Sequence, residues 1–233
     1  AALSGGRAVA GEVLQRMGDS IAHRGPDDGV VWLDRDEGPA AVGAVFRRLS
    51  IIDLEGGRQP IPNETGDVTC LVNGEIYNFR ELRTELEAAG HRFRTGSDAE
   101  TVVHLYEEHG DAVAEHLIGM FAFAIIDSRG AHPRVLIGRD RLGIKPMYYA
   151  HTKDGLAWAS ESKALLAMGA DGPGRAGVDR ELRGEALLEY LTRGFVGGEH
   201  SAWRGIERLR PGCTLAWDGA TGAVEIQRYW DLP

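Results

Sequence analysis

The segment that says most about the architecture reads Val68-Thr69-Cys70-Leu71-Val72-Asn73-Gly74-Glu75-Ile76-Tyr77-Asn78. Its first five residues are a largely apolar, β-branched run that predicts a strand. From Phe79 to Leu86, apolar residues recur at every third or fourth position, which is the spacing of a helix. The segment therefore predicts a strand followed by a helix, with the polar Asn73-Gly74-Glu75 motif near their junction.

Similar short runs lie on both sides of this segment. Further strands are predicted at residues 29–33, 41–46, 49–54, 120–126, 135–138, 147–150 and 156–159, and further helices at 9–21, 102–109 and 184–192. The sequence Ser97-Asp98-Ala99-Glu100 is typical of a capping box and predicts the start of the helix that contains 102–109. Strand runs interrupted by helices, without strict βαβ alternation, indicate antiparallel sheets layered with helices. The predicted fold class is α+β.

The end of the chain differs in character from the rest. A glycine-rich stretch from Gly169 to Gly177 reads as a surface loop or linker. After it, residues 214–217 and 224–230 predict a small terminal hairpin. We therefore place a core domain at residues 1–170 and a C-terminal extension, including the hairpin, at residues 171–233.

The composition is that of a globular protein without a basic surface. With 233 residues, 43% of them hydrophobic, the chain can bury a substantial core, and its 32 glycines suit many turns between short strands. A formal net charge of -9 argues against nucleic acid or an anionic membrane as a partner. The longest apolar run, Leu117 to Ile126, is too short for a membrane span, which needs roughly 20 residues.

The two cysteines, Cys70 and Cys213, fit neither a disulfide framework nor a CxxC metal site. We predict that both are unreactive core thiols in a reducing cytoplasm. The chain shows no ligand spacing typical of zinc, so no metal site is predicted.

Three further motifs accompany Asn73-Gly74-Glu75 along the chain. They are His23-Arg24-Gly25-Pro26-Asp27, Arg48-Leu49-Ser50-Ile51-Ile52-Asp53 and Thr95-Gly96-Ser97-Asp98, and longer matches follow at residues 119–124, 138–149 and 159–165. With this ordered set, the chain resembles the N-terminal glutaminase domain of glutamine-hydrolysing asparagine synthetases. Such domains are class II glutamine amidotransferases of the N-terminal-nucleophile hydrolase family.

The resemblance implies a four-layer αββα sandwich of two mainly antiparallel sheets. It also implies that an N-terminal cysteine attacks the side-chain amide of glutamine, and that ammonia leaves as a glutamyl thioester forms. The α-amine of that cysteine acts as the general base, and it suits this task because a free α-amine titrates near about 8. The cysteine is expected just before Ala1, with Ala1-Ala2-Leu3 as the rest of the first strand.

By the same resemblance, the side-chain amide of Asn73 and the backbone N–H of Gly74 form an oxyanion hole. Removing one such donor typically lowers the rate on the order of a hundredfold or more. An Asn-Gly pair between apolar runs is also a common signal for a type I′ hairpin turn. Because the other motifs are present, we favour the oxyanion hole.

The resemblance assigns Arg48, Glu75 and Asp98 to the head group of glutamine. A guanidinium can bind the carboxylate of the ligand in bidentate fashion, and carboxylates suit its ammonium. Two alternatives stay open: Asp98 could only stabilise the start of the following helix, and Arg48 could be a solvated cation at a strand edge. His23 is predicted to shape its loop through the Gly25-Pro26 turn and not to act as a base.

The predicted activity is the hydrolysis of glutamine to glutamate and ammonia. The ammonia would serve ATP-dependent amide formation, with asparagine synthesis from aspartate as the expected reaction, in a C-terminal synthetase domain of the same polypeptide. ATP and Mg²⁺ belong to that domain, no cofactor is expected for this one, and a homodimer is left open. The alternative is a non-catalytic scaffold domain, as in the β-lactam synthetases. An active glutaminase is favoured because the chain retains all five candidate residues, Arg48, Asn73, Gly74, Glu75 and Asp98.

Overall fold

The computed structural model describes residues 2–5, 9–26, 28–34, 42–48, 58–152, 155–169, 178 and 180–232. The chain divides into two compact units, each of which is discontinuous in sequence. The first unit comprises Ala1–Arg48 and Pro146–Arg210, and the second comprises Leu49–Lys145 and Pro211–Pro233. Each unit contains one six-stranded sheet in which the described strands pair in antiparallel fashion.

The sheet of the first unit has the strand order β10-β8-β9-β1-β3-β2. Its strands are β1 (Ala2–Gly5), β2 (Asp28–Leu33), β3 (Val42–Arg48), β8 (Tyr148–Thr152), β9 (Gly155–Ala159) and β10 (Glu207–Arg208). β1 lies inside the sheet, where Ala2 is opposite both Trp158 of β9 and Ala44 of β3. This pairing confirms the strand predicted for the first residues.

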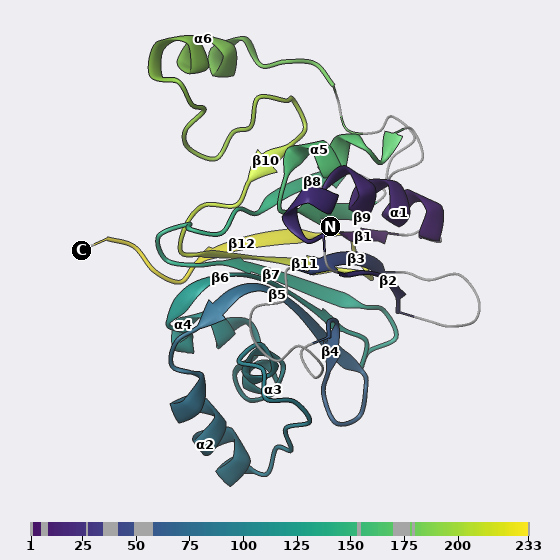
Figure 1. The fold of residues 1–233 in the computed structure, drawn as a ribbon, viewed down its shortest axis with the longest axis vertical. Helices are drawn as coiled ribbons and strands as arrows, with labels where there is room; N and C mark the ends of the chain where they lie inside the picture. The colour runs from purple at the N-terminus through teal and green to yellow at the C-terminus, as the bar shows by residue number, and fades with distance from the viewer. Residues whose placement is uncertain are drawn as a thin grey trace. The chain divides into compact units, whose positions relative to one another are not determined.

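Helices α1 (Gly11–Ser20) and α5 (Ser162–Leu166) lie together over the sheet of the first unit (Figure 1). The apolar side chains Val13, Leu14 and Met17 fall on one side of α1 and are all buried. Gly18 allows α1 to approach the sheet closely, because a Cβ there would lie 2.5 Å from Val45 Cγ2.

Helix α6 (Gly184–Arg193) also belongs to the first unit, and it differs from α1 in burial. Its three leucines, at positions 187, 188 and 191, are each at least half exposed, and Ala186 is its one buried residue. Among the described helices, none combines the length and the apolar character that a bilayer span requires.

The sheet of the second unit has the strand order β12-β11-β7-β6-β5-β4. Its strands are β4 (Ile61–Pro62), β5 (Val68–Ile76), β6 (Gly119–Asp127), β7 (Arg134–Arg139), β11 (Cys213–Asp218) and β12 (Val224–Arg228). Its helices are α2 (Phe79–Ala89), α3 (Glu100–His109) and α4 (Val113–His116). Within this unit α3 packs against β5, and α2 packs against α3 (Figure 1).

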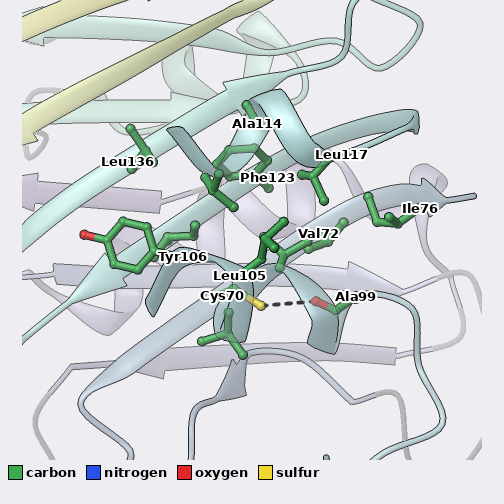
Figure 2. Packing of buried hydrophobic residues seen from close by; sticks show 14 of the residues in the cluster. Cys70, Val72, Ile76, Ala99, Leu105, Tyr106, Ala114, Leu117, Phe123 and Leu136 are labelled. Atoms are coloured by element: carbon green, nitrogen blue, oxygen red, sulfur yellow. Dashed lines mark hydrogen bonds between the residues drawn. The ribbon is translucent and has the colours of Figure 1, made fainter. Parts of the chain in front are cut away.

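Figure 2 shows the apolar core between α3 and the central strands of the second unit. Val72 of β5, Phe123 of β6 and Leu105 of α3 are each almost completely buried in it. Burying an apolar side chain of this size stabilises a fold by about 1.5–3 kcal/mol. The core therefore holds α3, and with it the loop that precedes α3, against β5.

Most of the predicted elements are confirmed with small shifts of their boundaries. The predicted terminal hairpin forms from β11 and β12, and β11 also pairs with β7, so the hairpin extends the second sheet. The strand predicted at 49–54 lies outside the described residues, as does the glycine-rich stretch beyond Gly169.

The capping box predicted at Ser97-Asp98-Ala99-Glu100 is wrong. Helix α3 begins at Glu100, and no side chain caps it. The carboxylate of Glu100 accepts hydrogen bonds from the N–H groups of Arg94 and Thr95, while the N–H of Ser97 donates to Thr95 Oγ1. Glu100 therefore fastens the loop before the helix and does not reach back to Ser97.

Candidate active site

The Asn73-Gly74-Glu75 motif lies within β5 and not in a turn. Asn73 is opposite Ala122 of β6, and the pairing with β6 continues without a break to the end of β5. The alternative of a type I′ hairpin turn is therefore wrong. The local hairpin signal is overridden because all nine residues of β5 pair with β6.

Gly74 is the one position of this motif where no other residue fits. Its φ of 146° lies in the region that L-residues rarely adopt. A Cβ at this position would lie 1.9 Å from the backbone oxygen of Met120 and 2.7 Å from the Cα of Phe121. The glycine therefore allows β5 and β6 to approach each other where the motif crosses the sheet.

Asp98 joins the loop before α3 to the end of β5. Its Oδ2 accepts a hydrogen bond from the N–H of Ile76 at 2.7 Å. Its backbone oxygen accepts two more, from the N–H and the Oγ1 of Thr101 in the first turn of α3. The carboxylate thus contacts the strand while the backbone is anchored to the helix.

Glu100 holds the same loop from the other side. It is almost fully buried, and it accepts hydrogen bonds from the N–H of Arg94 at 2.6 Å and from both the N–H and the Oγ1 of Thr95. Burial alone would raise the pKa of Glu100, but these bonds and the neighbouring His104 lower it to about 2. The sequence pattern predicted only a capping-box role for Glu100, and nothing in it indicated these contacts.

Glu75 and Asp98 line one pocket of about 220 Å³ in the second unit. The other lining residues are Ile76, Tyr77, Phe79 and Gly96. This volume lies below the range of about 300–1,000 Å³ usual for drug-sized ligands, and so suits a smaller one. Two carboxylates with no basic side chain among the described lining residues favour a ligand with a positive charge at this point.

Tyr77 and Phe79 also line the pocket and were not among the residues predicted for the site. The signal was present, because both lie within four residues after the Asn73-Gly74-Glu75 motif. Tyr77 is more than half exposed and lines the pocket, so its ring is accessible to a ligand there.

The structure gives less information on Asn73, Gly74 and Arg48 than on the two acids of the pocket. Asn73 and Gly74 precede the lining residues along β5 but do not themselves line this pocket. Arg48 is the last residue of β3 in the first unit, and its side chain lies outside the described part of the structure. The roles assigned to these three residues therefore stay predictions.

Arg47, the neighbour of Arg48, has a structural role, because its side chain contacts helix α1. Its guanidinium forms an ion pair with Asp19 at 2.5 Å and donates a hydrogen bond to the backbone oxygen of Gly18. Both partners lie in α1 of the same unit. Arg47 thus links α1 to β3, which leaves Arg48 as the better candidate for a ligand.

His23 takes part in a surface ion cluster of the first unit. Its Nε2 lies 3.0 Å from Glu161 Oε1, and the same carboxylate also pairs with Arg24 and Lys163. Although burial acts to raise it, the pKa of Glu161 is lowered by these partners. The contacts fit the predicted role in shaping a loop.

Both cysteines are buried, and neither is part of a disulfide. Cys70 Sγ donates a hydrogen bond to the backbone oxygen of Ala99 at 3.6 Å (Figure 2). Burial raises the pKa of the Cys70 thiol far above its usual value, which suppresses the reactive thiolate. Cys70 is therefore a core residue and not a nucleophile.

Comparison with known families identifies a glutamine amidotransferase domain at residues 2–230. The chain is 46% identical to asparagine synthetase (glutamine-hydrolysing) 2 of Bacillus subtilis (strain 168), over 94% of this chain and 28% of that protein. It is 40% identical to asparagine synthetase (glutamine-hydrolysing) 1 of the same organism, over 89% of this chain and 31% of that protein. The chain thus spans less than a third of the length of these two relatives.

Two solved structures share the fold at low identity. The glutamine phosphoribosylpyrophosphate amidotransferase of B. subtilis, complexed with ADP and GMP, has a TM-score of 0.66 and 18% identity over 98% of this chain and 48% of that one. A structure of the allosteric regulatory enzyme of purine biosynthesis has a TM-score of 0.68 and 17% identity, with the same coverage. The likeness confirms the α+β fold of two mainly antiparallel sheets. Because the family match runs from residue 2 to residue 230, the chain belongs to the class II glutamine amidotransferase domain family.

Proposed function

We propose that the protein carrying this chain hydrolyses glutamine at the pocket of Glu75 and Asp98 and uses the ammonia to form asparagine from aspartate. The observation that carries the proposal is the meeting of these two carboxylates in one small pocket, with Glu75 directly after Asn73 and Gly74 on β5. Identity to asparagine synthetases over most of the chain supports the choice of acceptor.

Each group at the site has a chemical task in this proposal. Glu75 and Asp98 bind the ammonium of glutamine, and Arg48 binds its carboxylate. The thiolate of the N-terminal cysteine attacks the amide carbon, and the Asn73 amide and the Gly74 N–H stabilise the oxyanion that forms. The C–N bond then breaks, ammonia leaves with a proton from the α-ammonium, and water hydrolyses the thioester to glutamate.

The rest of the reaction belongs to a larger protein. We propose that the glutaminase core at residues 1–170 is followed by an extension at 171–233 that leads into a synthetase domain, which binds ATP, Mg²⁺ and aspartate. The support is that the relatives named asparagine synthetases are about three times as long as this chain. We also propose a cytoplasmic location, because two buried cysteines outside any disulfide suit a reducing compartment.

The test compares two nitrogen sources in the full-length protein. Asp98→Asn and Glu75→Gln should each raise KM for glutamine while asparagine synthesis from free ammonia continues at its original rate. Glu85→Gln, which removes an exposed acid from α2, is the control and should leave both rates unchanged. Equal loss with glutamine and with ammonia would contradict the binding roles.

The same assay separates the enzyme from a scaffold. The purified protein is sequenced from its N-terminus and incubated with glutamine alone. Release of glutamate by a protein that begins with cysteine supports the proposal. A protein that leaves glutamine intact but forms asparagine from ammonia would have a non-catalytic domain here.

For Arg48, the neighbouring arginine provides a matched control. Arg48→Ala should raise KM for glutamine, because the ligand carboxylate loses its bidentate partner. Arg47→Ala removes a link between α1 and β3 and should lower stability without a specific effect on KM. If Arg47→Ala alone raised KM, the assignment of Arg48 would be wrong.

A further inference from the structure

Four potential metal ligands meet in the second unit, away from the pocket of Glu75 and Asp98. They are Glu64, His91, His104 and Glu107, and one ligand atom of each lies within 4.8 Å of the others. They come from three segments: the turn between β4 and β5, the loop after α2, and α3 itself. None of the four lines the pocket.

Several donor-atom distances are close to the edge of a small tetrahedron, with Glu64 facing the two histidines through its two different oxygens. His104 Nδ1 lies 3.3 Å from Glu64 Oε2 and 3.3 Å from Glu107 Oε2. His91 Nδ1 lies 3.3 Å from Glu64 Oε1 and 3.7 Å from Glu107 Oε2. Zinc bonds of about 2.0–2.2 Å in tetrahedral geometry place neighbouring ligand atoms about 3.3–3.6 Å apart.

The outer nitrogens of both imidazoles face further carboxylates. His91 Nε2 lies 3.1 Å from Glu108 Oε1, and His104 Nε2 lies 3.7 Å from Glu100 Oε1. Since an ionised carboxylate only accepts hydrogen bonds, each Nε2 should carry the proton. In the neutral tautomer the lone pair of each Nδ1 then points toward Glu64 and Glu107.

That arrangement is repulsive unless positive charge lies among the four groups. Protonating both imidazoles would supply it, but the two rings lie with their centroids only 4.8 Å apart. One divalent cation supplies the same charge at a single point and accepts all four lone pairs. We propose that Glu64, His91, His104 and Glu107 bind one zinc ion.

The surroundings orient the two carboxylates for this task. The Asn63 side-chain amide donates to Glu107 Oε1 at 2.8 Å, which leaves Glu107 Oε2 to face both histidines. The N–H of Arg92 donates to Glu64 Oε1 at 2.9 Å, while Glu64 Oε2 faces His104. Such outer partners, together with carboxylates behind ligating histidines, are typical of built metal sites.

Four protein ligands leave no open position, so the proposed zinc has a structural role. It ties the turn at Glu64 and the loop at His91 to α3. The site was missed in the sequence because only His104 and Glu107 are close along the chain. The choice of zinc over magnesium or calcium follows from the two imidazoles, which those hard cations do not favour.

The experiment measures metal binding by the full-length protein after treatment with a chelator. Zn²⁺ is titrated against a chromophoric chelator at pH 7.5, and Co²⁺ is added in parallel to record its visible absorption. We expect one tight zinc equivalent and the intense bands of tetrahedral Co²⁺, both of which are lost in His91→Gln and Glu64→Gln. Loss of a ligand should weaken zinc binding by more than the about 10–100-fold typical of losing an outer partner.

The controls separate binding from folding. His132→Gln removes an exposed histidine of the same unit and should bind zinc as the original protein does. Circular dichroism of the metal-free variants checks that each is folded, and only Zn²⁺ binding by the original protein should raise its Tm. Equal zinc affinity in the original protein and in His91→Gln would overturn the proposal. The absence of any tight equivalent in the folded original protein would also overturn it, in favour of two protonated histidines.

Discussion

Asp98 Oδ2 lies 2.7 Å from the backbone nitrogen of Ile76 and accepts its hydrogen bond. The bond connects the loop before α3 to the end of β5, and these two segments carry both acids of the pocket. Under the proposed function Asp98 would have two tasks, because the carboxylate that would bind an ammonium also holds the wall of the pocket together. Substitutions of Asp98 should affect both ligand affinity and local structure.

Asp98→Ala should raise KM for glutamine by roughly 10–100-fold, since a hydrogen bond to a charged group contributes about 1.5–3 kcal/mol. It should also lower the free energy of unfolding, because the N–H of Ile76 loses its acceptor. Steady-state kinetics with glutamine and with ammonia, and urea unfolding, check the two effects. An unchanged KM would limit Asp98 to the structural task.

Gly74→Ala should destabilise the second unit by on the order of 1–3 kcal/mol or more, as expected when a packed region is overfilled. The added methyl group would collide with the backbone of Met120, which cannot move away as a side chain could. Thermal unfolding gives the measurement. Gly66→Ala is the matched control, because Gly66 also has a positive φ but a Cβ there would meet nothing within 4 Å. A similar loss of Tm in both variants would attribute the effect to φ alone.

Glu100→Gln should loosen the loop that carries Asp98. A glutamine amide can replace only one of the two accepting oxygens, so an N–H of Arg94 or Thr95 loses its partner, at about 1–3 kcal/mol. We expect lower stability together with a higher KM for glutamine and a smaller change in kcat. A loss of kcat at unchanged KM would contradict a positioning role for Glu100.

The stability of the second unit should depend on pH through Asp127. Burial acts to raise the pKa of Asp127, but hydrogen bonds from Arg129 and Tyr106 lower it below its ordinary value of 3.8. A depressed carboxyl pKa stabilises the folded state above pH 3.8, and this stabilisation is lost as the pH falls through the folded value. Asp127→Asn should therefore reduce the free energy of unfolding by roughly 1 kcal/mol at pH 7 and by less at pH 3. Urea unfolding at both values tests this, and an equal difference at the two would refute it.

Cys70 should resist alkylation in the folded protein and react only after denaturation, because it is buried with a raised thiol pKa. Peptide mass spectrometry after treatment with iodoacetamide measures the labelling. Cys70→Ala should retain glutaminase activity. Loss of activity without a loss of stability would show that Cys70 takes part in the chemistry.

The periodicity of the sequence was enough to predict most strands and helices, because their apolar faces must be buried whatever the details of packing. It could not decide between a turn and a strand at Asn73-Gly74, since that choice depends on pairing with β6, which is distant in sequence. The capping box failed for a different reason. Glu100 accepts hydrogen bonds from the N–H groups of Arg94 and Thr95, and these residues lie outside the four-residue pattern on which the prediction was based.

The candidate site was predictable only in part. The resemblance selected Glu75 and Asp98, which the fold brings into one pocket, although 22 residues separate the bonded pair Ile76 and Asp98. Tyr77 and Phe79 were missed because aromatic residues directly after a strand or at the start of a helix are usually interpreted as core residues. The cluster of Glu64 and His91 with α3 was missed because residues from three segments produce no regular spacing.

The place of β1 between two partner strands has a consequence for conformational entropy. Ala2 is opposite Trp158 on one side and Ala44 on the other, so the backbone of β1 loses its freedom during folding and not during a reaction. A reacting group joined to β1 would be confined before glutamine binds, and less of the activation barrier would come from orienting it.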